Sequence, residues 1–211
     1  MLGLLCGAAL PLTKTWAQTV RAQSFGVAVK TATVNATAPL AVLPADGGLA
    51  SNAAQSVNVA GLAGAENVYA IASGAADLTR QLSAESNSTL ESVSLLNGLI
   101  TADAVVALAS SAIDGTVVSS NAEGSELGNL VVNGVPMTSA VEPNTRMTLP
   151  GVGYVVLNEQ ILSGDGSSSS GITVNMIHVV LQQPILGLLG EIIGYQTVGD
   201  IIVGSANSRV N

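Results

Sequence analysis

Aromatic and charged residues are both scarce in this chain of 211 residues, where they make up 2% and 9% of the sequence. Hydrophobic residues still reach 48%, so the interior has to be built from Val, Leu, Ile and Ala. Such a core suits flat and closely stacked sheets. The shortage of aromatic side chains also argues against a carbohydrate cleft, because such clefts usually offer aromatic faces.

Basic residues are also few. Six Lys and Arg oppose fourteen Asp and Glu, which gives a net charge of −8, and no run of basic residues occurs. Binding to nucleic acid or to an anionic membrane surface would need such a run to neutralise phosphate groups. We therefore expect no nucleic-acid partner and no membrane insertion of the mature chain.

Cysteine and histidine occur once each, as Cys6 and His178. Cys6 lies in an N-terminal segment with the features of a leader, so the mature chain would have neither a disulfide nor a thiolate metal site. His178 shares strand parity with Ile172, Val174 and Met176, which predicts a structural histidine that points toward the apolar side of its sheet. A zinc site or a Ser-His-Asp triad would need this one ring.

Acidic residues are scattered singly, without an Asp-x-Asp-x-Asp loop for calcium. Distant carboxylates could still converge in the fold, on a calcium site or as a hydrolase pair, and the sequence leaves this open. We expect a protein that is not an enzyme, with no catalytic, cofactor-binding or metal-binding residues and no cofactor.

Residues 1–17 have the features of a secretory signal peptide. Residues 2–12 form an apolar run of eleven residues, too short to span a bilayer as a helix. Small residues permit cleavage before Gln18, and a second possible site lies before Gln23. No basic residue precedes the run, so Met1 could be an internal start and the leader longer. We expect an exported protein, extracellular or on the cell surface, whose residues 18–211 form a single domain.

Turn dipeptides punctuate the remaining chain and predict hairpins between β-strands. They are Asp-Gly or Asn-Gly pairs that begin at Asp46, Asn97, Asp114, Asn133 and Asp165. Between them, β-branched apolar runs predict ten strands: 25–34, 56–62, 68–73, 82–95, 99–113, 116–120, 127–132, 153–162, 172–181 and 200–205. The predicted fold class is all-β, a single-domain two-sheet β-sandwich or jelly-roll-like arrangement.

Two segments are harder to assign. Residues 78–96 partly fit a helical stripe, but polar residues at alternate positions from Ser83 to Glu91 favour a strand, since Ser, Thr and Asn are poor helix-interior residues. Residues 184–195 are apolar and interrupted by glycines, unlike the rest of the chain, and predict a short apolar loop or a helix. We expect this segment to make a contact through the following residues: Ile185, Leu186, Leu188, Leu189, Ile192 and Ile193.

Several segments resemble the choice-of-anchor P family of bacterial surface proteins. They are VSLLNGLITADAVV (93–106), NLVVNGVPM (129–137), LPGVGYVVLNEQ (149–160), ITVNMIHVVL (172–181) and GDIIVGSANSRV (199–210), and FGVAVK (25–30) resembles the start of that domain. The resemblance implies export and a β-rich surface domain, and it carries over no catalytic residue. No sortase-type motif, apolar helix or basic tail follows residue 210, so the sequence departs from the family pattern here, and we expect retention at the surface to come from assembly.

The leading hypothesis is a secreted structural or adhesive surface protein, a subunit of an extracellular filament that self-associates into homo-oligomers by β-strand donation. Phe25, Val27 and Val29 alternate with small or polar residues near the mature N-terminus, as a donated strand would. The alternative for this strand is pairing within its own domain. The alternative function is a monomeric binding module that recognises a polysaccharide or a host surface through its loops.

Overall fold

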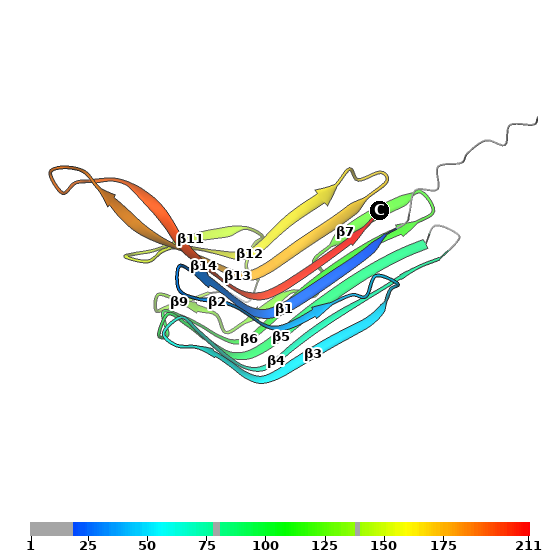
Figure 1. Cartoon of the computed structure of the whole chain (residues 1–211), viewed down its shortest axis with the longest axis horizontal. Coiled ribbons are helices and arrows are strands. Elements are labelled where there is room, and N and C mark those ends of the chain that lie inside the picture. The colour runs from blue at the N-terminus through cyan, green and yellow to red at the C-terminus, as the bar shows by residue number, and fades with distance from the viewer. Residues whose placement is uncertain (1–18, 78–80, 138–139) are drawn as a thin grey trace, which may run out of the picture.

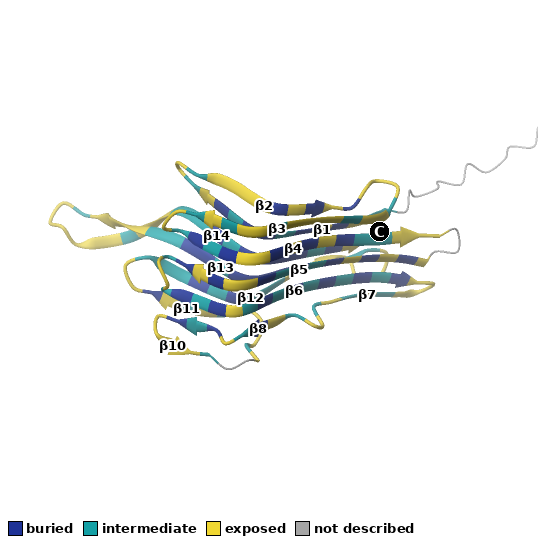
Figure 2. Ribbon diagram, turned by 90° about the horizontal axis from the view of Figure 1, so that it is seen from below, coloured by how far each residue is buried: buried dark blue, intermediate teal, exposed yellow. Residues whose placement is uncertain are grey.

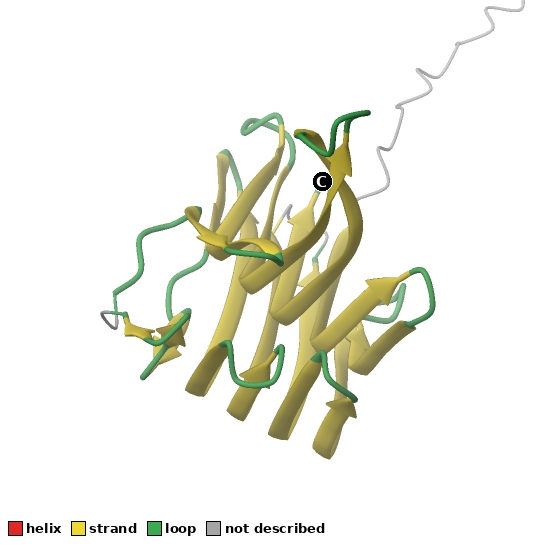
Figure 3. Ribbon diagram, turned by 90° about the vertical axis from the view of Figure 1, so that its left-hand side faces the viewer, coloured by secondary structure: helices red, strands yellow, loops and turns green. Residues whose placement is uncertain are grey.

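The computed structural model describes residues 19–77, 81–137 and 140–211, and all regular secondary structure in these ranges is β-strand. One sheet has six strands in the order β11-β12-β13-β14-β1-β2, and the other has eight, in the order β10-β9-β6-β5-β4-β3 with β7 and β8 also paired to β6. The two sheets pack face to face (Figures 1 and 3), which confirms the β-sandwich. The bounds in the six-stranded sheet are β1 Val20–Thr31, β2 Asn35–Val42, β11 Thr145–Leu149, β12 Gly153–Gly164, β13 Ser170–Leu186 and β14 Ile192–Val210. Those in the eight-stranded sheet are β3 Gly48–Val59, β4 Ala63–Ala76, β5 Gln81–Leu95, β6 Ile100–Asp114, β7 Val117–Asn121, β8 Glu126–Gly128, β9 Val131–Val132 and β10 Val135–Pro136.

The predicted turns are confirmed, because each of the five dipeptides lies where one strand ends and before the next begins; Asp114 is itself the last residue of β6. The Asn-Gly pairs at Asn97 and Asn133 place both residues at positive φ, which Asn and Gly tolerate better than other residues. The predicted leader, residues 1–17, lies outside the described residues. No helix in the described ranges is both long and apolar enough to cross a membrane.

The strand interpretation of residues 82–95 is confirmed by β5. Its inward positions from Leu82 to Leu90 are buried and the intervening residues face outward (Figure 2). The sequence missed β2, β10 and β11. β2 contains Pro39, which weakens a strand signal, but β2 is the edge of its sheet and an edge strand tolerates the missing N–H donor.

Serine side chains join the two sheets in the half of the sandwich that holds the C-terminus. Ser111 on β6 and Ser208 on β14 lie 2.7 Å apart between their hydroxyl oxygens, and Ser86 donates from β5 to the Asn207 carbonyl at 2.9 Å. These serines are buried, and small side chains at these positions allow the sheets to approach closely. The interior is therefore aliphatic, as predicted, with a polar seam that the sequence did not indicate.

The strands of both sheets bend at one level, so the molecule is V-shaped in Figure 1. At this level Asn67, Ser92, Asn158 and Gly204 adopt positive φ on β4, β5, β12 and β14. Each bend reverses which residues face inward: β14 buries Val203 on one side of Gly204 and Ala206 on the other. We call this line the crease. Along one strand, residues of one parity (odd or even numbers) face the core before the crease, and residues of the other parity face it after the crease.

Candidate functional site

The apolar segment near the C-terminus forms a β-hairpin that projects beyond the sandwich (Figures 1 and 2). β13 continues to Leu186 and β14 begins at Ile192, with Ile185 paired to Gly194 and Leu186 paired to Ile192. The loop that closes it is the predicted apolar loop, and the predicted helix alternative is wrong. Glycines every few residues weaken a helix, whereas the cross-strand pairs satisfy the backbone. We call residues 182–197 the hairpin arm.

The tip of the hairpin arm exposes large apolar side chains to solvent. Leu188 and Leu189 have relative exposures of 104% and 94%. Three hydrogen bonds fix the turn. The Gly187 N–H donates to the Glu191 carbonyl at 2.8 Å, the Gly190 N–H to the Gly187 carbonyl at 3.1 Å, and the Leu189 N–H to the Glu191 carboxylate at 3.0 Å. The predicted contact residues are all exposed, and Tyr195 joins them. An exposed group of this kind on a projecting element is typical of an interaction site.

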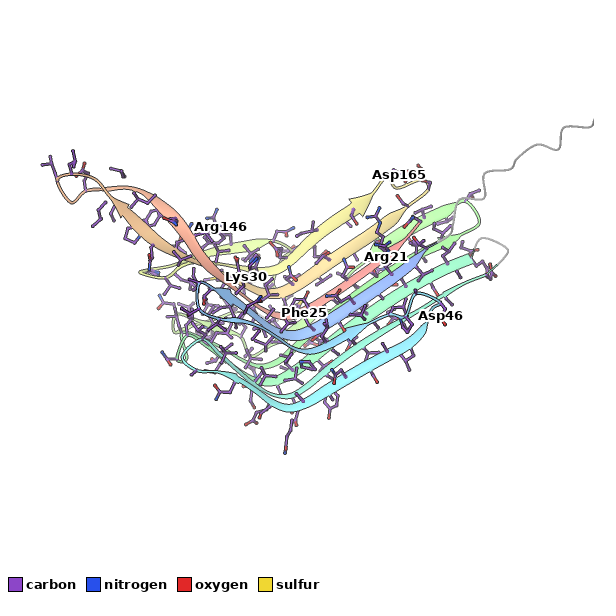
Figure 4. All side chains as sticks on the ribbon, in the orientation of Figure 1. Arg21, Phe25, Lys30, Asp46, Arg146 and Asp165 are labelled. Atoms are coloured by element: carbon purple, nitrogen blue, oxygen red, sulfur yellow. The ribbon has the colours of Figure 1, made fainter. Side chains whose placement is uncertain are left out.

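A groove lies at the base of the hairpin arm, between β11, β12 and the arm itself. It has a volume of about 430 Å³, and its lining includes Arg146, Tyr154, Pro184 and Tyr195. The Arg146 guanidinium stacks over the Tyr154 ring at 3.7 Å from the ring centre, which fixes both side chains. Figure 4 shows Arg146 beside the base of the arm. The groove therefore gathers two of the three tyrosines of the chain.

The predicted donor strand lies within its own sheet. β1 pairs with β14 along one side, from Val20↔Val210 to Thr31↔Gly199, and with β2 along the other. Val27 and Val29 are buried in the core, and Phe25 is partly buried. The alternative that the sequence left open, pairing within the domain, describes this structure. Because both edges of β1 carry hydrogen bonds, donating it to another copy would break two ladders.

His178 faces outward, so the prediction that it points toward the apolar side of its sheet is wrong. Ile172, Val174 and Met176 do face the core, but the crease crosses β13 at Met176 and the next inward residue is Ile177. Strand parity cannot be extended through such a bend. His178 is partly buried on the outer face of the six-stranded sheet.

Two carboxylates from different strands converge on His178. Its Nδ1 lies 3.0 Å from Glu159 Oε2 and its Nε2 lies 3.3 Å from Asp200 Oδ1. Asn175 donates to the same Glu159 oxygen at 2.7 Å and accepts from the Ser205 hydroxyl at 2.7 Å. Cross-strand register brings these residues together, since Glu159 pairs with Asn175 and Asn175 with Ser205. Nothing in the local sequence identified them as neighbours.

This network favours a charged imidazole and does not activate a nucleophile. The hydrogen bond with Glu159 raises the pKa of His178 above its usual value, and the same bond lowers the pKa of the Glu159 carboxyl. The Ser205 hydroxyl donates to Asn175 and not to the imidazole, so the order of bonds differs from that of a Ser-His-Asp triad. Within the described ranges, no group of three or more His, Cys, Asp or Glu side chains could hold a metal ion.

Comparison with known proteins places the chain in a family. Residues 23–160 match the family described as Domain of unknown function (DUF8256). No curated protein and no solved structure matches the chain. The matched residues run from β1 into β12 and stop short of the hairpin arm. This family match does not test the resemblance to choice-of-anchor P proteins, which stays a prediction. The match covers more than half of the sequence, and the chain therefore belongs to the DUF8256 family.

Proposed function

We propose that this chain is a secreted structural or adhesive protein of a bacterial surface, and that it associates with further copies of itself through the hairpin arm. The observation that supports the proposal is the apolar tip, where Leu188 and Leu189 stand in solvent on a hydrogen-bonded turn. A hydrogen-bonded turn is already ordered before contact, so binding through it loses little conformational entropy. The proposal keeps the predicted self-association and moves the contact from β1 to the arm.

The size of the apolar tip fits an anchor in an interface. Burying one exposed leucine contributes about 1.5–3 kcal/mol, so Leu188 and Leu189 together contribute about 3–6 kcal/mol. Association costs about 4–15 kcal/mol in lost translational and rotational freedom, so two leucines alone do not hold two copies together. Ile185, Leu186 and Ile192 supply further exposed apolar area on the same arm. Together they are large enough to act as a hot spot.

A protein partner fits the arm better than a lipid surface does. Elements that lie on membranes combine apolar residues with Lys or Arg, which bind anionic lipid, and commonly with Trp or Phe. Residues 182–197 contain no basic residue, no Trp and no Phe, and their single charged residue is Glu191. The chain also carries a net charge of −8, which opposes approach to an anionic bilayer.

The position of β1 agrees with export by cleavage before Gln18. Val20 pairs with Val210 and Ala22 with Ser208, so cleavage before Gln23 would remove the first paired residues of a central strand. Cleavage before Gln18 would leave the β1–β14 ladder intact.

The test compares the assembly of three proteins that begin at residue 18. Analytical ultracentrifugation and negative-stain microscopy would be applied to the wild type, to Leu188→Ser/Leu189→Ser, and to the control Leu49→Ser/Leu162→Ser. The control removes two leucines that are 68% and 72% exposed elsewhere on the molecule. We expect oligomers or filaments from the wild type and the control, and monomers from the tip variant with an unchanged melting temperature.

A wild type that stays monomeric at every concentration would contradict self-association. If that monomer bound to neutral phosphatidylcholine vesicles and the tip variant did not, the arm would be a lipid contact instead. If the tip variant assembled as the wild type does, the contact would lie elsewhere.

The groove at the base of the arm favours a second candidate function, recognition of a polysaccharide. Tyr195 offers an exposed aromatic face beside the stacked pair of Arg146 and Tyr154, and Arg146 offers donors for hydroxyl groups. Glycan-array binding by the wild type, lost in Tyr195→Ala, would support this function. Equal binding by the wild type and Tyr195→Ala would place any glycan site elsewhere.

A further inference from the structure

A second groove lies on the half of the sandwich that is remote from the hairpin arm. It has a volume of about 570 Å³ and lies between the start of β1 and the end of β2. Val42, which is 52% exposed, contributes apolar surface, and Arg21 contributes a guanidinium, whereas Val20 and Leu43 pack against the core at the edge of the groove. In Figure 4 the arm projects from one end of the molecule, and Arg21 lies on the limb of the V that leads to the other end.

Arg21, which lines this groove, belongs to an arrangement of charge beside the groove that the monomer does not explain. Arg21 on β1 pairs directly with Arg209 on β14, so two guanidinium groups are cross-strand neighbours. Like charges in this position destabilise a sheet. Neither arginine forms an ion pair with any residue in the described ranges. Only six basic residues occur in the whole chain, so two of them side by side indicate an anionic occupant.

We propose that this groove receives the hairpin arm of the next copy, so that copies join head to tail. This inference rests on the proposed function and adds the receiving surface. The arm would place Leu188 and Leu189 against Val42, the exposed apolar side chain of the groove. Glu191, the single charge of the arm, would lie toward Arg21 and Arg209 and offset their mutual repulsion.

The separation of arm and groove decides the geometry of assembly. Arm and groove are different surfaces, so the contact is heterologous and each bound copy still offers a free groove at one end and a free arm at the other. Repetition of such a contact gives a ring or an open filament. The competing arrangement, a symmetric pair of hairpin arms, would bring two Glu191 carboxylates together with no basic residue in either arm to compensate.

The test reverses the two charges singly and together. The variants Arg21→Glu and Glu191→Arg each replace attraction with repulsion, and we expect each to raise the dissociation constant for assembly about tenfold or more. The combined variant restores opposite charges and should assemble better than either single variant, but below the wild-type level, because Glu191→Arg also removes the hydrogen bond from the Leu189 N–H that fixes the turn. Lys30→Glu is the control for charge, because it makes the same change on β1 outside the groove. Lys30 pairs with Asp200, so this variant should melt at a lower temperature, but its assembly should be unchanged.

A mixing experiment separates the head-to-tail contact from a symmetric one. Leu188→Ser/Leu189→Ser keeps an intact groove with a defective arm, and Arg21→Glu keeps an intact arm with a defective groove. A head-to-tail contact predicts that the two monomeric variants form a heterodimer that grows no further. A symmetric contact between arms predicts no heterodimer, because one of the two arms is defective, and this result would overturn the inference.

Failure of the inference can be told apart from failure of the proposed function. If the wild type assembles and needs its tip leucines, but Arg21→Glu assembles normally, the receiving groove is wrong and self-association stands. If the wild type remains monomeric, self-association itself is wrong.

Discussion

Substitution of Gly204 by alanine tests whether the crease depends on close approach of the two sheets. Gly204 has a φ of +64°, and a Cβ built there would lie 2.6 Å from Val105 Cγ1 on the facing sheet. Alanine at positive φ costs about 1–2 kcal/mol, and overpacking a filled core costs about 1–3 kcal/mol. We therefore expect Gly204→Ala to lower the free energy of unfolding by about 2–5 kcal/mol, a large part of the roughly 5–15 kcal/mol of a typical domain.

Two other glycines separate the backbone cost from the steric cost. Gly98 has a φ of +89° with nothing within 4 Å of a built Cβ, so Gly98→Ala should lose only the backbone contribution, about 1–2 kcal/mol. Gly26 is the residue of β1 that lies at the crease. It lacks positive φ, and a Cβ built there would clash with Val68 Cγ1. Gly26→Ala should therefore show the steric contribution alone.

Urea denaturation monitored by circular dichroism measures all three variants. With a slope of about 2 kcal/mol per molar urea, a loss of about 3 kcal/mol lowers the midpoint by about 1.5 M. Val105→Ala removes the atom that the new methyl would meet, so it should cost less stability in the Gly204→Ala background than in the wild type. The reasoning is refuted if Gly204→Ala proves no less stable than Gly98→Ala.

Two further predictions concern buried and partly buried polar groups. The pKa of His178 is raised on folding, so its stabilisation is complete below its ordinary value of 6.5 and is lost as the pH rises through the folded value. The pKa of Glu159 is lowered, so its stabilisation is present above its ordinary value of 4.5 and is lost as the pH falls through the folded value. Urea denaturation of the wild type should find the greatest free energy of unfolding between these two pH values. In His178→Gln the free energy of unfolding should fall less above them than in the wild type, and an equal fall in both proteins would contradict the network. Ser88 Oγ is buried without a hydrogen-bond partner among the described residues, so Ser88→Ala should be neutral or stabilising by up to about 1 kcal/mol. Ser86→Ala should destabilise the protein, because Ser86 donates to the Asn207 carbonyl. Equal losses of melting temperature in the two variants would count against this distinction.

The local patterns in the sequence were sufficient for the fold class because they report short-range physics. Asn-Gly and Asp-Gly pairs mark turns through their tolerance of positive φ, and alternation from Ser83 to Glu91 identified β5. The same reasoning missed β2, whose Pro39 weakens the strand signal. It also ended β13 too early, at residue 181, and began β14 too late, at residue 200. Glycines within an apolar run are compatible with a loop or a strand, and the pairing partner decides between them.

What the sequence by itself determined was the all-β class, the turns, the aliphatic core and the apolar character of the segment that became the hairpin arm. These follow from side-chain chemistry and from spacing along the chain. The tertiary structure alone decided which residues face outward beyond the crease, that β1 is a central strand, and that Glu159 and Asp200 flank His178. It also decided that Arg21 faces Arg209 and that the arm projects into solvent. The reason is that register and bending are set by pairing between strands far apart in the chain, and a shift of one residue reverses every side chain that follows.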